Sequence, residues 1–139
     1  MKTPLPSGEA MDDELARAEV YGLLAALFQA ARAPELYAQL QVAATQAPVA
    51  GAFLEHSFSE LVAASRRLPL DAVRAEYAAL FEAIGKPVVF LYASYFVAGA
   101  LNEKPLVVLR DALRALGIER DPMILETEDH IACLCEVMR

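Results

Sequence analysis

Cysteine, histidine and glycine are scarce in this sequence, and each shortage excludes a class of site. Among 139 residues there are two cysteines, two histidines and six glycines. Cys133 and Cys135 are too close together in a helix to form a disulfide, and two cysteines are too few for a secreted disulfide scaffold, so we expect a reducing compartment. Catalysis by an imidazole would depend on His56 or His130 alone, and we expect His56 to be an exposed residue at a helix end.

Common enzyme motifs and membrane signals are also missing. The chain contains no GxGxxG, GxxxxGK(S/T), GxSxG or HExxH pattern, so we predict that it is not an enzyme. Its first residues lack the apolar stretch of a signal peptide. The uncharged, mostly apolar stretch Pro87–Leu101 is shorter than the about 20 apolar residues that a membrane span needs. We therefore expect a cytoplasmic protein without stable membrane insertion.

The charge balance favours a cationic partner. Twelve Lys and Arg residues against nineteen Asp and Glu residues give a formal net charge of -7. A protein of this charge is repelled by phosphate backbones and anionic lipid, so we expect no nucleic-acid partner. Hydrophobic residues make up 57% of the chain and charged residues 22%, which excludes disorder for most of it. The apolar excess indicates a large core, a surface for a partner, or a domain that lacks part of its covering.

The spacing of apolar residues predicts an all-helical fold. Glycine is scarce, alanine is abundant, and apolar residues recur every three or four positions. The predicted helices cover about 13–31, 34–46, 57–68, 71–85, 94–101, 105–117 and a last one from 131. Ser57, Asp71 and Thr127 are the predicted N-terminal caps, Pro105 opens a helix, and Gly85 and Gly117 end helices. Residues 86–92 are predicted to form an extended loop.

Near the end of the chain, three residues could together ligate a metal. His130, Cys133 and Cys135 are all residue types that bind zinc. In a helix, however, positions 130 and 133 share a face that position 135 does not. A site with three such ligands would require a distorted helix.

The acidic residues just before them allow two further interpretations. Glu126, Glu128 and Asp129 could be ordinary carboxylates at the start of a helix, which interact favourably with its dipole, with both cysteines as small core residues. Alternatively, these carboxylates and His130 form the acidic end of a binding site for guanidinium groups, which prefer bidentate carboxylate partners.

Aromatic and apolar residues form a second candidate site. They are Tyr77, Leu80, Phe81, Phe90, Tyr92, Tyr95 and Phe96. Side chains at helical spacing usually belong to the core. Tyr92, Ser94 and Tyr95 adjoin a short loop, and their hydroxyl groups are typical of recognition grooves as well as of buried tyrosines.

Three blocks of residues carry a resemblance to a known family. They contain Glu76, Tyr77, Leu80 and Phe81; Tyr92, Ser94 and Phe96; and Glu126, Glu128, Asp129, His130 and Ile131. In order and spacing they are similar to the aromatic-x-x-Leu-Phe, aromatic-Glu-Ser-x-Tyr and Glu-Pro-x-Asp-His-Ile blocks of the TorD/DmsD group of cytoplasmic redox-enzyme maturation chaperones, which are related to the NarJ assembly proteins. Ala93 replaces the family's glutamate, and Thr127 replaces its proline.

The resemblance implies a chaperone without a cofactor of its own. Residues 1–139 would form a single TorD-like helical domain, with residues 1–11 disordered. The protein would bind the twin-arginine signal peptide, the apoprotein, or both, of a molybdenum-cofactor oxidoreductase, and delay export until the cofactor is inserted. Because that signal is a cationic pair followed by an apolar segment, its receptor needs carboxylates beside an apolar groove. The expected binding residues are Tyr77, Leu80, Phe81, Tyr92, Ser94, Glu126, Asp129 and His130.

The length of the chain leads to a further expectation. Members of the family normally add helices after the Asp-His block, so we expect those helices to be absent here, and two chains to exchange domains as a homodimer. Two alternatives remain open at this stage. One is a small metal- or nucleotide-binding helical protein that uses Asp129 and His130, and the other is a helical dimerisation module.

Overall fold

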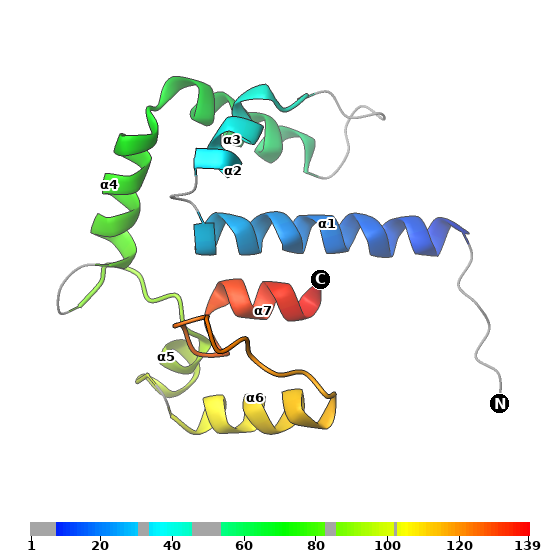
Figure 1. Cartoon of the computed structure of the whole chain (residues 1–139), viewed down its shortest axis with the longest axis vertical. Helices are drawn as coiled ribbons and strands as arrows, with labels where there is room; N and C mark the ends of the chain where they lie inside the picture. Colours follow the sequence, from blue (N-terminus) through cyan, green and yellow to red (C-terminus); the bar gives the residue numbers. More distant parts are fainter. Residues whose placement is uncertain (1–7, 31–33, 46–53, 83–85, 102) are drawn as a thin grey trace. The chain divides into compact units, whose positions relative to one another are not determined.

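The computed structural model describes residues 8–30, 34–45, 54–82, 86–101 and 103–139. Within these ranges the chain forms seven helices and no strand, which confirms the all-α prediction (Figure 1). No helix of the described part is long and apolar enough to cross a membrane. The chain divides into two compact units, residues 1–29 with 90–139 (unit 1) and residues 30–89 (unit 2). That residues 1–139 form one domain stays a prediction.

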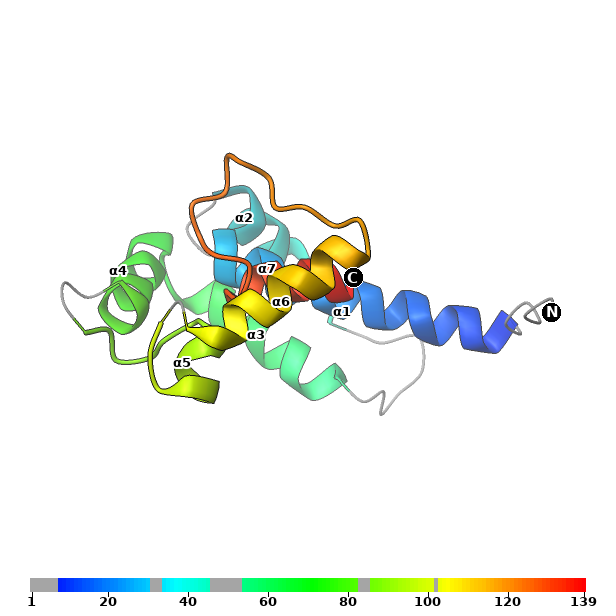
Figure 2. The ribbon, with the colours of Figure 1, turned by 90° about the horizontal axis from the view of Figure 1, so that it is seen from below.

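Unit 1 contains α1 (Gly8–Ala30), α5 (Ala93–Ala98), α6 (Lys104–Ala115) and α7 (Ile131–Met138). α7 lies beside α1 (Figures 1 and 2), and a Cβ built at Gly22 would stand 3.2 Å from the side-chain Nε of Arg139. α5 packs on α6. The buried apolar residues of this unit are Ala25, Leu106, Leu113, Ala132 and Cys135.

Unit 2 contains α2 (Pro34–Val42), α3 (Glu55–Arg67) and α4 (Leu70–Phe81). α2 and α3 pack on each other. Arg66 donates hydrogen bonds to the carbonyl oxygens of Gln41 and Ala43, each at 2.9 Å, and so satisfies acceptors at the end of α2. The buried residues of the unit are Tyr37, Leu40, Val62 and Ser65, and α4 contributes none.

Several predicted helix starts were wrong by a few residues. α3 begins at Glu55 after Leu54, so Ser57 lies inside the first turn and forms no capping box. α4 begins at Leu70 after Pro69, and Asp71 instead pairs with Arg74, its Oδ1 lying 3.4 Å from the guanidinium. In both cases the helix starts earlier than the polar residue that could have capped it. α1 starts at Gly8, so residues 8–11, expected to be disordered, are helical.

Helix ends show the role of glycine. α6 begins with Pro105 in its first turn and is followed by Gly117 at φ 72°, as predicted. α5 ends at Ala98 before Gly99 at φ 77°, earlier than the predicted end at 101. Both glycines occupy the left-handed region, which other residues adopt only with strain. α4 ends at Phe81, and Gly85, its predicted end, lies outside the described residues.

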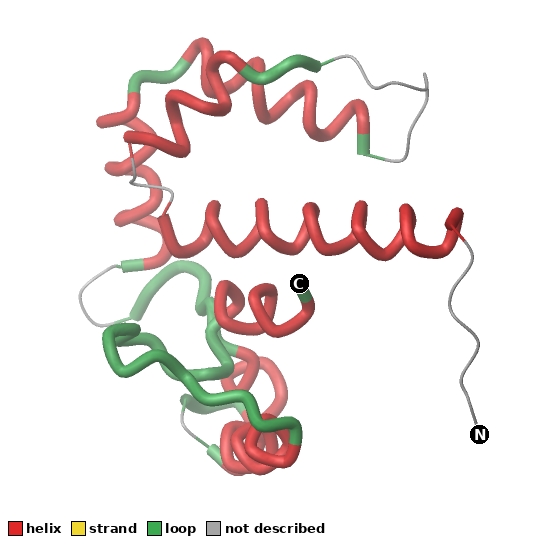
Figure 3. Tube along the Cα trace, turned by 45° about the vertical axis from the view of Figure 1, so that its right-hand side comes forward, coloured by secondary structure: helices red, strands yellow, loops and turns green. Residues whose placement is uncertain are grey.

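Two segments without helix approach each other in unit 1. Residues 86–92 form a loop, as predicted, but with bends at 86, 88 and 89; its residues 90–92 belong to unit 1, where residues 116–130 form a long connection between α6 and α7 (Figure 3). Tyr92 and His130 form an isolated antiparallel bridge. Ile131 N–H donates to the carbonyl oxygen of Leu91 at 2.8 Å, and Ala93 N–H donates to that of Asp129 at 3.0 Å. This pairing brings the starts of α5 and α7 together.

Candidate functional site

Asp129 lies at the centre of a buried polar network. Its side chain is 1% exposed. Oδ2 accepts from the backbone N–H of Ser94 at 3.0 Å and from the Ser94 hydroxyl, and Oδ1 accepts from the Thr127 hydroxyl at 2.6 Å. Burial alone would raise the pKa of Asp129, but these donors from Ser94 and Thr127 hold it below its ordinary value. The carboxylate is therefore ionised and caps the N-terminus of α5 from a distant part of the chain.

This arrangement corrects the prediction that Thr127 caps the last helix. The N-terminal cap of α7 is His130, whose Nδ1 accepts from the backbone N–H of Ala132 at 3.2 Å. Thr127 instead donates to Asp129. An acceptor at Nδ1 requires the neutral imidazole. Burial lowers the pKa of His130, against the raising effect of the charges of Glu126 and Asp129, and so agrees with the neutral form.

Tyr92 packs against the imidazole that caps α7. The two rings meet edge to face, with centroids 5.0 Å apart. Burial, together with the negative charges of Glu126 and Asp129, raises the pKa of the Tyr92 phenol, so the hydroxyl is protonated at neutral pH. Tyr92 is half-buried, whereas Ser94 and His130 are buried. Of these three predicted site residues, Tyr92 is therefore the most accessible to a ligand.

Glu128 is already occupied by guanidinium groups of its own chain. Arg110 approaches its Oε2 with Nε and Nη2, each at 2.8 Å, and Arg120 Nε lies 3.7 Å from Oε1. Burial would raise the pKa of Glu128, but a backbone hydrogen bond and these two arginines hold it below its ordinary value. The carboxylate thus binds two guanidinium groups in the way that the sequence predicted for an external ligand.

Glu126 differs from its two acidic neighbours. Its side chain is half-buried, and its carboxylate makes no hydrogen bond or ion pair within the described part of the chain. The negative charge of Glu126 nonetheless affects its neighbours, because it acts to raise the pKa values of Tyr92, His130 and Cys133. Of the three predicted carboxylates, it is the one that could accept a new donor without losing an existing partner.

The other predicted binding residues belong to unit 2. Tyr77, Leu80 and Phe81 lie on α4 and are half-buried. The rings of Tyr77 and Phe81 stand 4.9 Å apart and tilted by 60°, as positions one helical turn apart allow. The Leu80 carbonyl oxygen accepts from Val89 N–H at 3.0 Å. That these residues act together with those of unit 1 stays a prediction.

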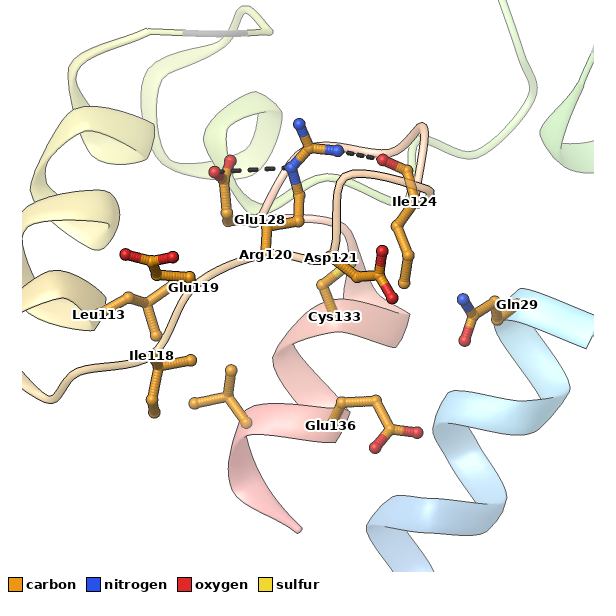
Figure 4. Close-up of a pocket in the computed structure, with 11 residues that line it drawn as sticks. Gln29, Leu113, Ile118, Glu119, Arg120, Asp121, Ile124, Glu128, Cys133 and Glu136 are labelled. Atoms are coloured by element: carbon orange, nitrogen blue, oxygen red, sulfur yellow. Dashed lines mark hydrogen bonds and ion pairs between the residues drawn. The ribbon is translucent and has the colours of Figure 1, made fainter.

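Unit 1 contains a pocket that no sequence pattern predicted. It has a volume of about 380 Å³ and lies among α1, α6, the segment 116–130 and α7 (Figure 4). Its apolar lining consists of Leu113, Ile118, Ile124, Cys133 and Val137. Its polar lining consists of Gln29, Glu119, Arg120, Asp121, Glu128 and Glu136. Ile118 and Val137 are 37% and 38% exposed, so the pocket is open to solvent.

No local pattern revealed these lining residues beforehand. The lining residues come from four segments of the chain. Arg110 and Arg120, which both contact Glu128, lie 18 and 8 positions before it in the sequence.

Metal binding by His130, Cys133 and Cys135 gains no support, because no group of three potential ligands is found among the described residues. Cys133 and Cys135 are both free thiols, and burial is the largest cause that raises the pKa of each.

Comparison with known proteins matches part of the chain to a family. The family model described as "Nitrate reductase delta subunit" matches residues 47–139. No curated protein and no solved structure matches the chain. The matched region is more than half of the chain and includes every residue of the predicted binding site, from Tyr77 to His130. The chain therefore belongs to the nitrate reductase delta subunit family, a family of redox-enzyme maturation chaperones.

Proposed function

We propose that this protein is a cytoplasmic assembly chaperone of the TorD/DmsD type. It binds the twin-arginine signal peptide, the apoprotein, or both, of a molybdenum-cofactor oxidoreductase, and delays export until the cofactor has been inserted. The observation that carries the proposal is the family match over residues 47–139. A protein with this role needs reversible peptide binding and no catalytic group of its own.

In this proposal Glu126 receives an arginine of the signal peptide. Its half-buried carboxylate makes no hydrogen bond or ion pair within the described residues. A guanidinium that reached it would form a charge-assisted hydrogen bond in a partly desolvated place, where such bonds are strong. The net charge of -7 would attract the cationic segment over a longer range.

Asp129, Ser94 and His130 take positioning roles in the same proposal. Asp129 is 1% exposed and engages both carboxylate oxygens with donors of its own chain. A guanidinium could bind it only in place of one of these donors. The three residues instead hold the starts of α5 and α7 against each other, and so fix the loop that carries Glu126.

The apolar part of the signal peptide would lie against half-buried aromatic and leucine side chains. Tyr92 in unit 1 and Tyr77, Leu80 and Phe81 in unit 2 are the proposed contacts, and all four are half-buried. Covering about 400 Å² of apolar peptide surface would contribute on the order of 10 kcal/mol, of which the ordering of the peptide consumes a large part. Moderate, reversible affinity follows.

Titration calorimetry tests the proposal directly. A peptide with two consecutive arginines followed by an apolar segment should bind, and a twin-lysine control should bind more weakly, because lysine cannot form the planar bidentate contact. Glu126→Gln should weaken the binding of the arginine peptide and flatten its salt dependence. Glu35→Gln is the matched control, since it removes the same charge from an exposed position on α2. Equal, negligible heats for both peptides would contradict the proposed function.

We also propose that the protein forms a homodimer by domain exchange. Supporting it, α5 and α6 expose large apolar side chains, with Phe96 69%, Val97 73% and Val108 68% exposed. Such exposed apolar surface is typical of interaction sites. Light scattering at micromolar concentration should report twice the mass of the 15.1 kDa chain. A monomeric mass at every concentration would contradict this.

A further inference from the structure

The pocket of unit 1 combines an apolar interior with acidic side chains at its edge. Ile118, Ile124 and Val137 supply apolar wall from three different segments of the chain. None of the eight binding residues expected from the sequence lines it. It shares the segment 124–128 with them, however, since Ile124 and Glu128 line the pocket on either side of Glu126. The pocket is therefore a separate site next to the predicted one.

The charges around the pocket are unbalanced. Four carboxylates line it, those of Glu119, Asp121, Glu128 and Glu136, against the one guanidinium of Arg120. A ligand complementary to this lining carries positive charge next to apolar groups. Glu128 further indicates which cation fits, because its partners in the structure are guanidinium groups from Arg110 and Arg120. A planar guanidinium with an apolar stem matches both features.

The side chain of Arg120 occupies the position beside Glu128 that the guanidinium of a ligand would take. Its Nη1 donates to the carbonyl oxygen of Ile124 and, at 3.3 Å, to that of Glu126, while its Nε lies 3.7 Å from Glu128 (Figure 4). The side chain is one-third exposed. An ion pair of this length and exposure is weak, so a second guanidinium can replace Arg120 beside Glu128 at little electrostatic cost. Glu128 keeps its shorter contacts to Arg110 in that exchange.

We propose that this pocket binds an arginine together with a neighbouring apolar side chain of a client peptide, and that Arg120 competes with the peptide's arginine for Glu128. The inference rests on the proposed function for the nature of the peptide, and it adds a second binding site and an internal competitor. Arg120 is then a specificity-determining residue. Only a ligand that both replaces its charge and fills the apolar pocket gains net binding energy.

The affinity test uses the full chain and a fluorescent peptide with two arginines followed by apolar residues. Arg120→Gln removes the competing charge and should tighten binding about threefold, the size expected for one weak exposed ion pair. Arg17→Gln is the matched control, because it removes the same charge from an exposed residue of α1 that pairs only with Glu14 among the described residues and does not line the pocket. Glu136→Gln should weaken binding by a similar factor.

A second readout reports on the pocket itself. Cys133 lines it, and Cys135 is the other cysteine of the chain, so Cys135→Ala leaves a single thiol inside the pocket. Saturating peptide should slow the reaction of Cys133 with a thiol reagent several-fold. Should Cys135→Ala fail to fold, the affinities measured with both native cysteines still decide the question.

The outcomes separate the two proposals. If the peptide binds, but Arg120→Gln has the same affinity as Arg17→Gln and Cys133 is not protected, the pocket proposal is overturned and the proposed function stands. If no variant binds the peptide, both are overturned. Tighter binding by Arg120→Gln with protection of Cys133 supports the pocket.

Discussion

The two units of the chain bury different kinds of side chain. In unit 1 an aspartate, a histidine and a serine are 1%, 6% and 0% exposed, namely Asp129, His130 and Ser94. In unit 2, among the described residues, the buried polar side chain is that of Ser65, whose hydroxyl donates to a carbonyl oxygen of its own helix, that of Val62, at 2.7 Å. Unit 1 thus has a buried polar centre that joins separate segments, whereas the polar contacts from α2 to α3 and Leu68 are part-buried or exposed.

The difference shows what each unit needs in order to be stable. A buried carboxylate costs desolvation energy, which is recovered only through several well-placed donors, as for Asp129. Its donors come from residues 94 and 127, so the network joins the first turn of α5 to the segment 116–130, which has no helix of its own. In unit 2 helix packing and helix-end hydrogen bonds suffice. We infer that the network holds the polar groups of unit 1 in fixed positions.

The largest expected effect is on Asp129. Asp129→Ala leaves the Ser94 N–H and the hydroxyls of Ser94 and Thr127 without their acceptor in a buried place. The free energy of unfolding should fall by about 3 kcal/mol. Urea denaturation followed by circular dichroism measures it. A loss below about 1 kcal/mol would mean that water reaches the network, and the proposed contrast between the units would fail.

A pair of buried serines sharpens the comparison. Ser94→Ala removes a charge-assisted hydrogen bond to Asp129 and should cost about 2 kcal/mol. Ser65→Ala removes only a hydrogen bond to a helix carbonyl and should change the free energy of unfolding by less than about 0.5 kcal/mol. The same denaturation experiment compares both variants. Equal losses would show that burial, and not the nature of the acceptor, decides the cost.

Arg66 tests the helix-end contacts of unit 2. Arg66→Ala removes hydrogen bonds to the carbonyl oxygens of Gln41 and Ala43 at the end of α2. Because the side chain is exposed and water can replace it, the loss should be about 1 kcal/mol. Arg67→Ala, the exposed neighbour with no hydrogen bond or ion pair among the described residues, is the control. Thermal unfolding of both variants gives the difference.

The smallest effect at neutral pH is expected for His130→Asn. Asparagine can accept the Ala132 N–H and retain the cap of α7. Because burial lowers the pKa of His130 below 6.5, the unfolded chain binds more protons than the folded one as the pH falls below 6.5. As the pH falls from 6.5 to the lower pKa of His130 in the folded protein, the free energy of unfolding of the native protein therefore decreases. His130→Asn should not show this decrease. Unfolding at pH 7.5 and 5.5 measures this; identical pH dependence would exclude a buried neutral histidine.

Much of the fold could be predicted from the sequence because its determinants are local. Apolar spacing gave the helices, and Pro105 and Gly117 marked the limits of α6, since each acts through its own backbone geometry. The predicted caps Ser57, Asp71 and Thr127 were wrong because capping is not determined by the local sequence alone. Whether a polar side chain caps a helix depends on where the chain turns, and the turn was decided by residues outside the local motif.

The candidate site was predictable as a set of residues but not as an arrangement. The block from Glu126 to His130 stood out by composition, yet its carboxylates turned out to have three different environments. Asp129 is buried in a network, Glu128 is paired with arginines, and Glu126 makes no hydrogen bond or ion pair among the described residues. Spacing along the chain carries no information about donors that approach from 18 or 35 positions away.

The sequence by itself determined the all-helical class, the acidic character and the family of this protein, because composition, periodicity and local blocks of residues need no partner elsewhere in the chain. Only the tertiary structure decided that Asp129 is buried in a network with Ser94 and Thr127, that Arg110 and Arg120 already pair with Glu128, and that a pocket opens beside α7. These features depend on the burial and orientation of side chains from separate segments, and the free energies of ionised groups change with both.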